Sequence, residues 1–184
     1  MNLPNKLTML RILMIPVFVV LALQTGTALQ IAALVVFLLA SFTDFLDGQI
    51  ARKNNLVTDF GKFADPIADK LLVMSALVVF VGQARMPSWT CILMLAREFI
   101  ISGFRLVAAG SGKVIAAGWL GKVKTVSQMA AIVLILLFVP VGGAEFAANV
   151  GTILANVALY FATFMTVWSG ADYIVRNFDC IKDM

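Results

Sequence analysis

The sequence predicts an all-α protein, a bundle of six transmembrane helices with both termini in the cytoplasm. Hydrophobic residues make up 61% of the 184-residue chain and charged residues 13%, about half the share of charge in soluble domains. The mean hydropathy is +0.98. The chain contains several apolar stretches of the roughly 20 residues that one helical crossing requires. We therefore expect a single integral-membrane domain over residues 1–184.

The expected spans are separated by turn signals or by charged segments. The uncharged stretch 12–43 is too long for one crossing, and the residues at 24–27, Gln-Thr-Gly-Thr, are typical of a turn, so the stretch is divided there. The six expected spans are residues 6–24, 29–52, 66–83, 88–109, 118–140 and 145–177. The fourth span contains Arg97, Glu98 and Arg105, which must face other helices rather than lipid.

Lysine and arginine residues set the orientation, because cytoplasmic segments of membrane proteins carry an excess of them. If the N-terminus is cytoplasmic, six spans return the C-terminus to the same side. Most of the fourteen basic residues then lie at cytoplasmic ends, and only Arg85 falls clearly outside. The net charge of +4 is explained by these segments and by anionic lipid headgroups, so we expect membrane lipid and no nucleic acid as a partner.

Four carboxylates mark the ends of the second and third expected spans: Asp44, Asp47, Asp65 and Asp69. With about 100° between successive helical residues, Asp44 and Asp47 fall within one arc, and Asp65 and Asp69 share a face of the next helix. Two facing helices would bring four negative charges together, which is unfavourable unless a cation lies between them. All four ligands are oxygen, which Mg²⁺ and Mn²⁺ prefer, so we expect a divalent-metal site.

Structural alternatives exist for two of the four carboxylates. Asp65 precedes Pro66, and Asp at an N-cap followed by Pro is a common start of a helix. Asp69 is followed by Lys70, with which it can form a surface ion pair. The other two carboxylates lie at the end of their span, where the helix dipole disfavours negative charge, and a functional role explains them better.

The chain carries the spacing D-x-x-D-G-x-x-A-R-x8-G-x-x-x-D-x-x-x-D, which resembles the signature of the CDP-alcohol phosphotransferases. The matching positions are Asp44, Asp47, Gly48, Ala51, Arg52, Gly61, Asp65 and Asp69. Residues 2–8, 96–99 and 121–125, together with Ser102 and Arg105, are similar to the bacterial branch of that family that uses glycerol 3-phosphate. The resemblance therefore covers most of the chain.

The resemblance implies transfer of the phosphatidyl group from CDP-diacylglycerol to an alcohol, with CMP as the leaving group. It also implies two divalent ions, Mg²⁺ or Mn²⁺, held by the four aspartates, with Asp69 as the catalytic base. The residues implied in CDP-lipid binding are Gly48, Ala51, Arg52, Gly61, Asn5 and Thr8. The family further implies a homodimer, here in the bacterial inner membrane with the active site facing the cytoplasm.

Basic residues beyond the signature indicate an anionic acceptor. The candidates for binding its phosphate are Arg105, Lys122, Arg97 and Arg176. A neutral acceptor such as serine would not need these cations, so a phosphorylated alcohol is favoured. Glycerol 3-phosphate agrees with the branch that the chain resembles, and inositol phosphate is the nearest rival.

Some of these basic residues have structural alternatives. Arg105 shares a helix face with Glu98 and can pair with it, and Arg176 can pair with Asp172 four residues earlier. Two lysines two residues apart point in directions roughly 200° apart on a helix. We expect Lys122 to face the site and Lys124 to snorkel toward the lipid headgroups.

Aromatic residues near the predicted membrane interfaces are expected to be belt residues. These are Trp89, Trp119, Trp168 and Tyr173. The competing functional class is a transporter or channel, since intramembrane charges also mark ion pathways. Such a pathway needs polar groups through both halves of the bilayer, whereas the outer half here carries almost none, and this favours an enzyme.

Overall fold

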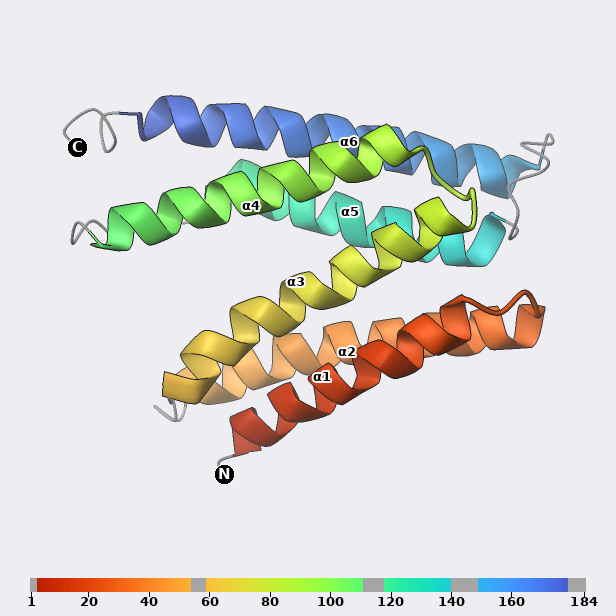
Figure 1. The fold of residues 1–184 in the computed structure, drawn as a ribbon, viewed down its shortest axis with the longest axis horizontal. Coiled ribbons are helices and arrows are strands. Elements are labelled where there is room, and N and C mark those ends of the chain that lie inside the picture. Colours follow the sequence, from red (N-terminus) through yellow and green to blue (C-terminus); the bar gives the residue numbers. More distant parts are fainter. Residues whose placement is uncertain (1–2, 54–58, 111–117, 140–148, 179–184) are drawn as a thin grey trace. The chain divides into compact units, whose positions relative to one another are not determined.

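The computed structural model describes residues 3–53, 59–110, 118–139 and 149–178 and, within them, the side chains of residues 6–43, 67–110, 118–139 and 149–178. These ranges contain six helices and no strand (Figure 1). The helices are α1 (Leu3–Ala22), α2 (Thr27–Lys53), α3 (Asp59–Gly82), α4 (Ser88–Gly110), α5 (Trp119–Phe138) and α6 (Val150–Arg176). The prediction of an all-α protein with six helices is confirmed.

The turn between α1 and α2 lies where the sequence predicted it. α1 ends at Ala22, and the carbonyl of Gly26 accepts hydrogen bonds from the amides of Leu29 and Gln30, both at 3.0 Å. These are the first bonds of α2. A short turn of this kind makes the two helices antiparallel neighbours.

Two helices start more than three residues away from the expected spans. α3 begins at Asp59, about two turns before the expected start at Pro66. Asp65 therefore lies inside a helix, and the alternative that it forms the N-cap is wrong. α6 begins at Val150 rather than at residue 145, after Asn149, whose side chain accepts a hydrogen bond from the Gly151 amide at 3.1 Å.

Many large apolar side chains point outward. Leu13, Ile92 and Val157 are each about 60% exposed, and every helix carries others like them. Within the described residues, α5 and α6 are long and apolar enough to cross a membrane, and α2 begins with a shorter apolar stretch, Thr27–Thr43. An apolar exterior of this extent is typical of a membrane protein, while the number of crossings stays a prediction.

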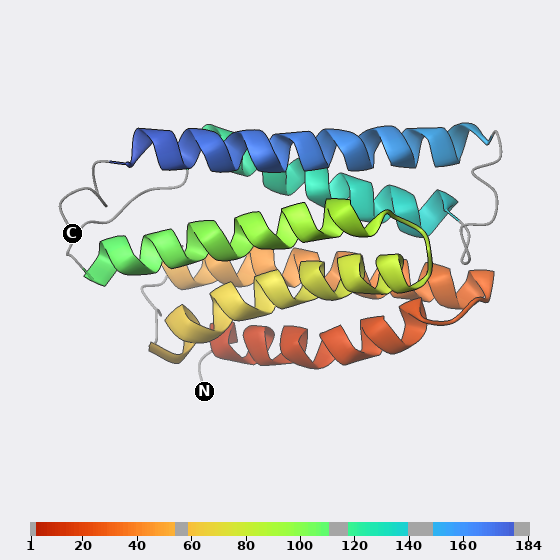
Figure 2. The ribbon, with the colours of Figure 1, turned by 45° about the horizontal axis from the view of Figure 1, so that its top comes forward.

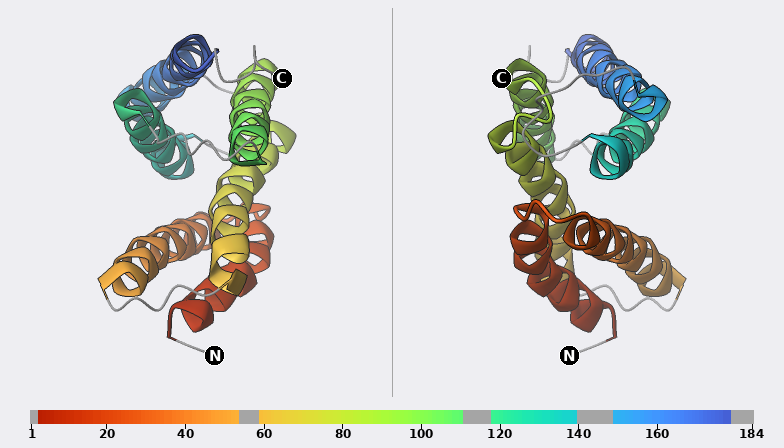
Figure 3. Two further views of the ribbon diagram at one scale, coloured as in Figure 1. Left: turned by 90° about the vertical axis from the view of Figure 1, so that its left-hand side faces the viewer. Right: turned by 90° about the vertical axis from the view of Figure 1, so that its right-hand side faces the viewer.

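The helices form two compact units, one made of α1–α3 and the other of α4–α6 (Figure 2). In the α1–α3 unit, α1 packs against both other helices, and the buried rings of Phe18 and Phe37 have centroids 5.7 Å apart. In the α4–α6 unit, α6 packs along α5 (Figure 3) and also contacts α4. Ala155 and Ala162 of α6 are fully buried, because small residues allow membrane helices to approach closely.

The turn after α3 contains a residue with left-handed backbone conformation. Ala84 has φ of 53°. The Arg85 amide donates to the Phe80 carbonyl at 2.8 Å, and the Ala84 amide donates to the Val81 carbonyl at 3.1 Å. This pair of bonds is a Schellman motif, which normally has glycine in the left-handed position. The sharp reversal carries Arg85 back toward the ends of the α1–α3 helices.

Arg85, the basic residue that the charge pattern leaves outside, is buried in the α1–α3 unit. Its Nη1 donates to the amide oxygens of Gln30 at 2.7 Å and Gln83 at 3.3 Å, and its guanidinium lies 5.5 Å from the centroid of the Phe80 ring. Both glutamine side chains donate in turn to the carbonyl of Ala22, at 2.8 and 2.7 Å. Burial lowers the pKa of Arg85 to about 10, so it stays charged at neutral pH and joins the ends of three helices.

Candidate active site

The predicted metal ligands lie on two helices of the α1–α3 unit. Asp44 and Asp47 are in the last third of α2, and Asp65 and Asp69 are in the first half of α3. The end of α2 and the start of α3 lie at the same end of this unit (Figure 1). Of the four side chains only that of Asp69 is described, and it is partly buried. Among the described side chains no three acids, histidines or cysteines form a metal-binding group, so the metal site stays a prediction.

The residues implied in CDP-lipid binding lie on the same three helices. Gly48, Ala51 and Arg52 are in α2, Gly61 is in α3, and Asn5 and Thr8 are in α1. Only Thr8 has a described side chain, which is 1% exposed and lies one turn before Arg11, a fully buried arginine. Burial of an arginine is costly, and the distribution of basic residues along the sequence does not predict it. Arg11 lies three residues after Thr8, on the same helix face, and this spacing is the signal that would have predicted its burial.

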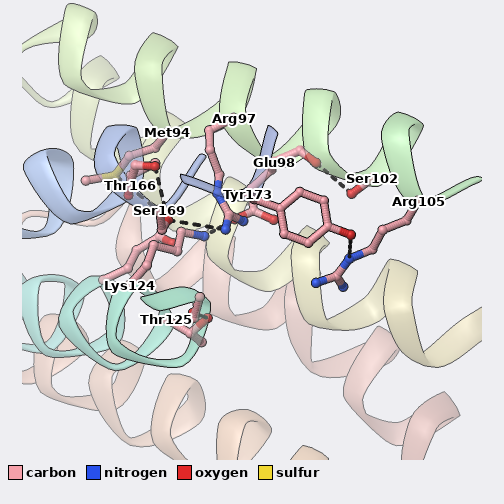
Figure 4. Close-up of polar contacts among 12 residues, drawn as sticks. Met94, Arg97, Glu98, Ser102, Arg105, Lys124, Thr125, Thr166, Ser169 and Tyr173 are labelled. Carbon is pink, nitrogen blue, oxygen red and sulfur yellow. Dashed lines mark hydrogen bonds and ion pairs between the residues drawn. The ribbon is translucent and has the colours of Figure 1, made fainter. Parts of the chain in front are cut away.

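The α4–α6 unit contains a polar network centred on Glu98 of α4 (Figure 4). The Glu98 carboxylate forms an ion pair with Lys124 of α5 and accepts a hydrogen bond from Nη1 of its neighbour Arg97 at 3.3 Å. Nη2 of Arg97 donates to the hydroxyl of Ser169 on α6, also at 3.3 Å. The side chains of Lys124 and Glu98 are 5% and 15% exposed. The network therefore connects all three helices of the unit with charges that are largely removed from solvent.

A glycine of α6 leaves room for Arg97 in this network. A Cβ atom at Gly170 of α6 would lie 3.0 Å from Cγ of Arg97, and one at Gly121 of α5 would lie 3.9 Å from its Nη2. The first distance is shorter than ordinary van der Waals contact between carbons. The guanidinium can therefore reach between the backbones of α5 and α6 because position 170 has no side chain.

Arg105, two turns after Glu98 on α4, has a separate partner. Its Nε donates to the hydroxyl of Tyr173 on α6 at 3.2 Å, and its guanidinium carbon lies 5.3 Å from the centroid of the same ring (Figure 4). The side chain of Arg105 is otherwise exposed. Within the described residues, its two terminal nitrogens make no hydrogen bond. Arg105 is thus held through Nε, and its two terminal nitrogens remain available to donate hydrogen bonds to an oxyanion.

Three expectations from the sequence are changed by these contacts. Lys124 does not snorkel toward lipid headgroups, because it is buried against Glu98, whereas Lys122 is exposed. In the described part of the unit, Glu98 pairs with Lys124 and Arg97, and Arg105 contacts Tyr173 instead. Tyr173 is 7% exposed, so it is not a belt residue at the membrane interface.

Arg176 forms the pair with Asp172 that the sequence analysis gave as its structural alternative. Nε of Arg176 donates to Oδ1 of Asp172 at 2.7 Å, with the arginine side chain 72% exposed. An exposed pair of this kind contributes little to stability. It leaves Arg176 accessible, so its role toward an acceptor stays a prediction.

Sequence reasoning missed Tyr173 and Ser169 as members of the site. Both belong to the buried face of α6, with Ala162, Thr166 and Gly170. These residues recur at spacings of three and four, as expected for one helix face. That periodicity, together with the small or polar residues on this face, would have predicted a buried tyrosine rather than an interfacial one.

The α4–α6 helices carry more positive than negative charge. Their five cationic side chains are Arg97, Arg105, Lys122, Lys124 and Arg176, and their two carboxylates are Glu98 and Asp172. Lys124 and Arg97 pair with Glu98, and Arg176 pairs with Asp172, which leaves the exposed side chains of Arg105 and Lys122 available to bind an anion. The arrangement therefore suits a ligand that carries a phosphate group.

Comparison with known proteins gives the family. The family model for CDP-alcohol phosphatidyltransferases matches residues 1–168, which include helices from both units. The chain belongs to the CDP-alcohol phosphatidyltransferase family, as the aspartate signature predicted.

Individual relatives match over almost the whole chain. A protein of Bacillus subtilis named CDP-diacylglycerol–glycerol-3-phosphate 3-phosphatidyltransferase is 42% identical over 98% of this chain and 97% of its own. The Escherichia coli protein of the same name is 38% identical over 94% of this chain and 93% of its own. A probable phosphatidylglycerophosphate synthase of Mycobacterium tuberculosis is 39% identical over 95% of this chain and 81% of its own.

The Glu98 network predicts unequal effects of two acid-to-amide substitutions. Glu98→Gln leaves Lys124 and Arg97 without their counterion in an apolar unit and should reduce the free energy of unfolding by about 3–5 kcal/mol. Asp172→Asn is the matched control, because it breaks an exposed pair and should cost less than about 1 kcal/mol. Unfolding of both purified variants in the same detergent micelles measures the difference. Equal stability of the two variants would show that the buried ion pair is not required.

Proposed function

We propose that this chain transfers the phosphatidyl group of CDP-diacylglycerol to glycerol 3-phosphate, giving phosphatidylglycerophosphate and CMP. Family membership supports the transfer reaction, and relatives of about 40% identity are named for this donor and this acceptor. The observation that carries the choice of a phosphorylated acceptor is the cation excess of α4–α6, with the open guanidinium of Arg105. A phosphorylated alcohol can accept charge-assisted hydrogen bonds from these cations, which a neutral alcohol cannot.

The donor side of the reaction is assigned to the aspartates of α2 and α3. Asp44, Asp47, Asp65 and Asp69 offer only oxygen ligands, and no histidine occurs in the sequence, so the donor set fits hard divalent ions such as Mg²⁺ or Mn²⁺, two of them in our proposal. When bound, such ions neutralise the negative charge that develops around phosphorus. The residues proposed to contact the CDP-lipid are Gly48, Ala51, Arg52, Gly61, Asn5 and Thr8.

The chemical step requires one proton transfer and one displacement at phosphorus. The acceptor hydroxyl oxygen bonds to the phosphorus of the phosphatidyl group, and the bond from that phosphorus to the CMP oxygen breaks, so CMP leaves with the bonding electrons. Asp69 takes the hydroxyl proton as general base. Arg105 and Lys122, with Arg97 and Arg176, bind the phosphate of the acceptor and orient its hydroxyl.

The proposed location is a bacterial inner membrane. All six helices are proposed to cross it, with both termini and the site residues at the cytoplasmic side, as the distribution of lysine and arginine indicates. The outward-facing apolar side chains then contact lipid. A homodimer is proposed from the family alone, and both units are assigned to one catalytic domain because a single family match runs through them.

Two aspartate substitutions separate metal binding from proton transfer. Asp44→Asn removes charge from a metal ligand and should weaken metal and CDP-diacylglycerol binding together. Asp69→Asn should retain metal-dependent binding of the CDP-lipid, yet turn over at least about 10²-fold more slowly, the lower range of general-base contributions. Binding and CMP release are measured on the same preparations. A nearly normal rate for Asp69→Asn rejects the base assignment, and loss of donor binding would show that Asp69 acts chiefly as a metal ligand.

The acceptor assignment predicts a selective change in KM. Arg105→Gln removes a charge-assisted hydrogen bond to phosphate, which contributes about 1.5–3 kcal/mol. The KM for glycerol 3-phosphate should therefore rise roughly 10- to 150-fold, with little change in the KM for CDP-diacylglycerol, and Lys122→Gln should act in the same direction. Initial rates of CMP release at varied concentrations of each substrate give both constants. Equal increases of the two KM values would contradict the assignment.

A further inference from the structure

Packing against α4 holds the side chain of Tyr173 in place, in addition to its contact with Arg105. Its ring is 7% exposed and packs in a small apolar cluster with Ile101 and Phe104 of α4. The rings of Phe104 and Tyr173 meet edge to face, with centroids 5.7 Å apart and an angle of 80° between their planes. Such packing leaves the tyrosine little rotational freedom. Its hydroxyl therefore has a defined position at the edge of the cluster.

The hydroxyl of Tyr173 meets Arg105 at Nε, the position nearest the arginine stem. The distance is 3.2 Å, and the guanidinium also lies 5.3 Å from the ring centroid. A free arginine side chain has up to about 2 kcal/mol of conformational entropy to lose when it binds a ligand. An arginine that is already held by a rigid tyrosine has lost part of that entropy in advance. Because Nε is occupied by the tyrosine hydroxyl, the two terminal nitrogens are the ones that remain to bind an oxyanion.

We propose that Tyr173 is a positioning residue for the acceptor phosphate: it orients Arg105 so that its two terminal nitrogens bind the phosphate side by side. This inference rests on the proposed function, in which Arg105 binds glycerol 3-phosphate. Tyr173 itself does not touch the substrate in this arrangement. It acts through Arg105, by the hydrogen bond to Nε and by the contact between its ring and the guanidinium.

The test is the variant Tyr173→Phe, which removes the hydroxyl and keeps the packed ring. The KM for glycerol 3-phosphate should rise about three- to tenfold, the size expected for one hydrogen bond, with a smaller effect on the KM for CDP-diacylglycerol. A matched control is Tyr160→Phe, on the same helix. Tyr160 stacks on Trp89 with centroids 6.0 Å apart, away from Arg105, and its hydroxyl should have no effect on either KM.

A double-mutant cycle distinguishes positioning from a general structural role. If Tyr173 acts through Arg105, Tyr173→Phe should raise the KM for glycerol 3-phosphate in the wild-type background and have no further effect in the Arg105→Gln background. A structural role would instead affect both substrates and add to the effect of Arg105→Gln.

The remaining outcomes separate this inference from the proposed function. If Arg105→Gln raises the KM for glycerol 3-phosphate and Tyr173→Phe does not, the positioning role is overturned and the acceptor site stands. If Arg105→Gln leaves that KM unchanged, both the acceptor assignment and the role of Tyr173 are overturned. Additive effects in the double variant also overturn the positioning role.

Discussion

Charged side chains within apolar helices must have partners, because an isolated charge that is removed from water costs several kcal/mol. In the described parts of this chain, two buried charges meet this constraint with protein partners, and a third cation stays exposed. Arg85 donates to the amide oxygens of Gln30 and Gln83, near the ends of α2 and α3, and Lys124 pairs with Glu98. Arg105 rests on a tyrosine and keeps two nitrogens open. The first two arrangements stabilise the fold, and the third leaves a cation for a ligand.

This constraint also explains how the fold relates to the proposed reaction. Glu98 satisfies Lys124 and Arg97 inside the α4–α6 unit, so these two cations have protein partners in the structure. Arg105 and Lys122 are exposed and are better suited to bind an incoming phosphate. An acceptor with its own negative charge then supplies the counterion that the helices lack. Selection of the acceptor is thus attributed to charge-assisted hydrogen bonds from two exposed cations.

Much of the fold could be predicted from the sequence, and the errors have physical reasons. The turn at Gly26 was predicted because an uncharged stretch of 32 residues, 12–43, cannot be one crossing. The start of α3 was placed too late, because Asp65 followed by Pro66 imitates a helix start, although the helix begins at Asp59. Hydropathy detects the apolar centre of a membrane helix but not the polar turns that extend it beyond the membrane.

The site was less predictable, because helical spacing gives angles between residues and not the face that is buried. The sequence predicted that Lys122 and Lys124 point in opposite directions. Which of the two is buried depends on Glu98 of another helix. Tyr173 was assigned to the interface from its residue type, whereas its neighbours on α6 place it in the interior. The aspartate signature was recognised from its spacing alone and gave the family that the comparison confirms.

The central claim, that the cations of α4–α6 select a phosphorylated acceptor, is tested most directly by the choice of alcohol. Purified protein with CDP-diacylglycerol and Mg²⁺ is given glycerol 3-phosphate, glycerol, serine or inositol phosphate, and CMP release is measured. The account predicts a KM for glycerol 3-phosphate at least about 10-fold below that for glycerol, the value of one charge-assisted hydrogen bond, and the fastest release with glycerol 3-phosphate. Equal use of glycerol or serine would contradict it.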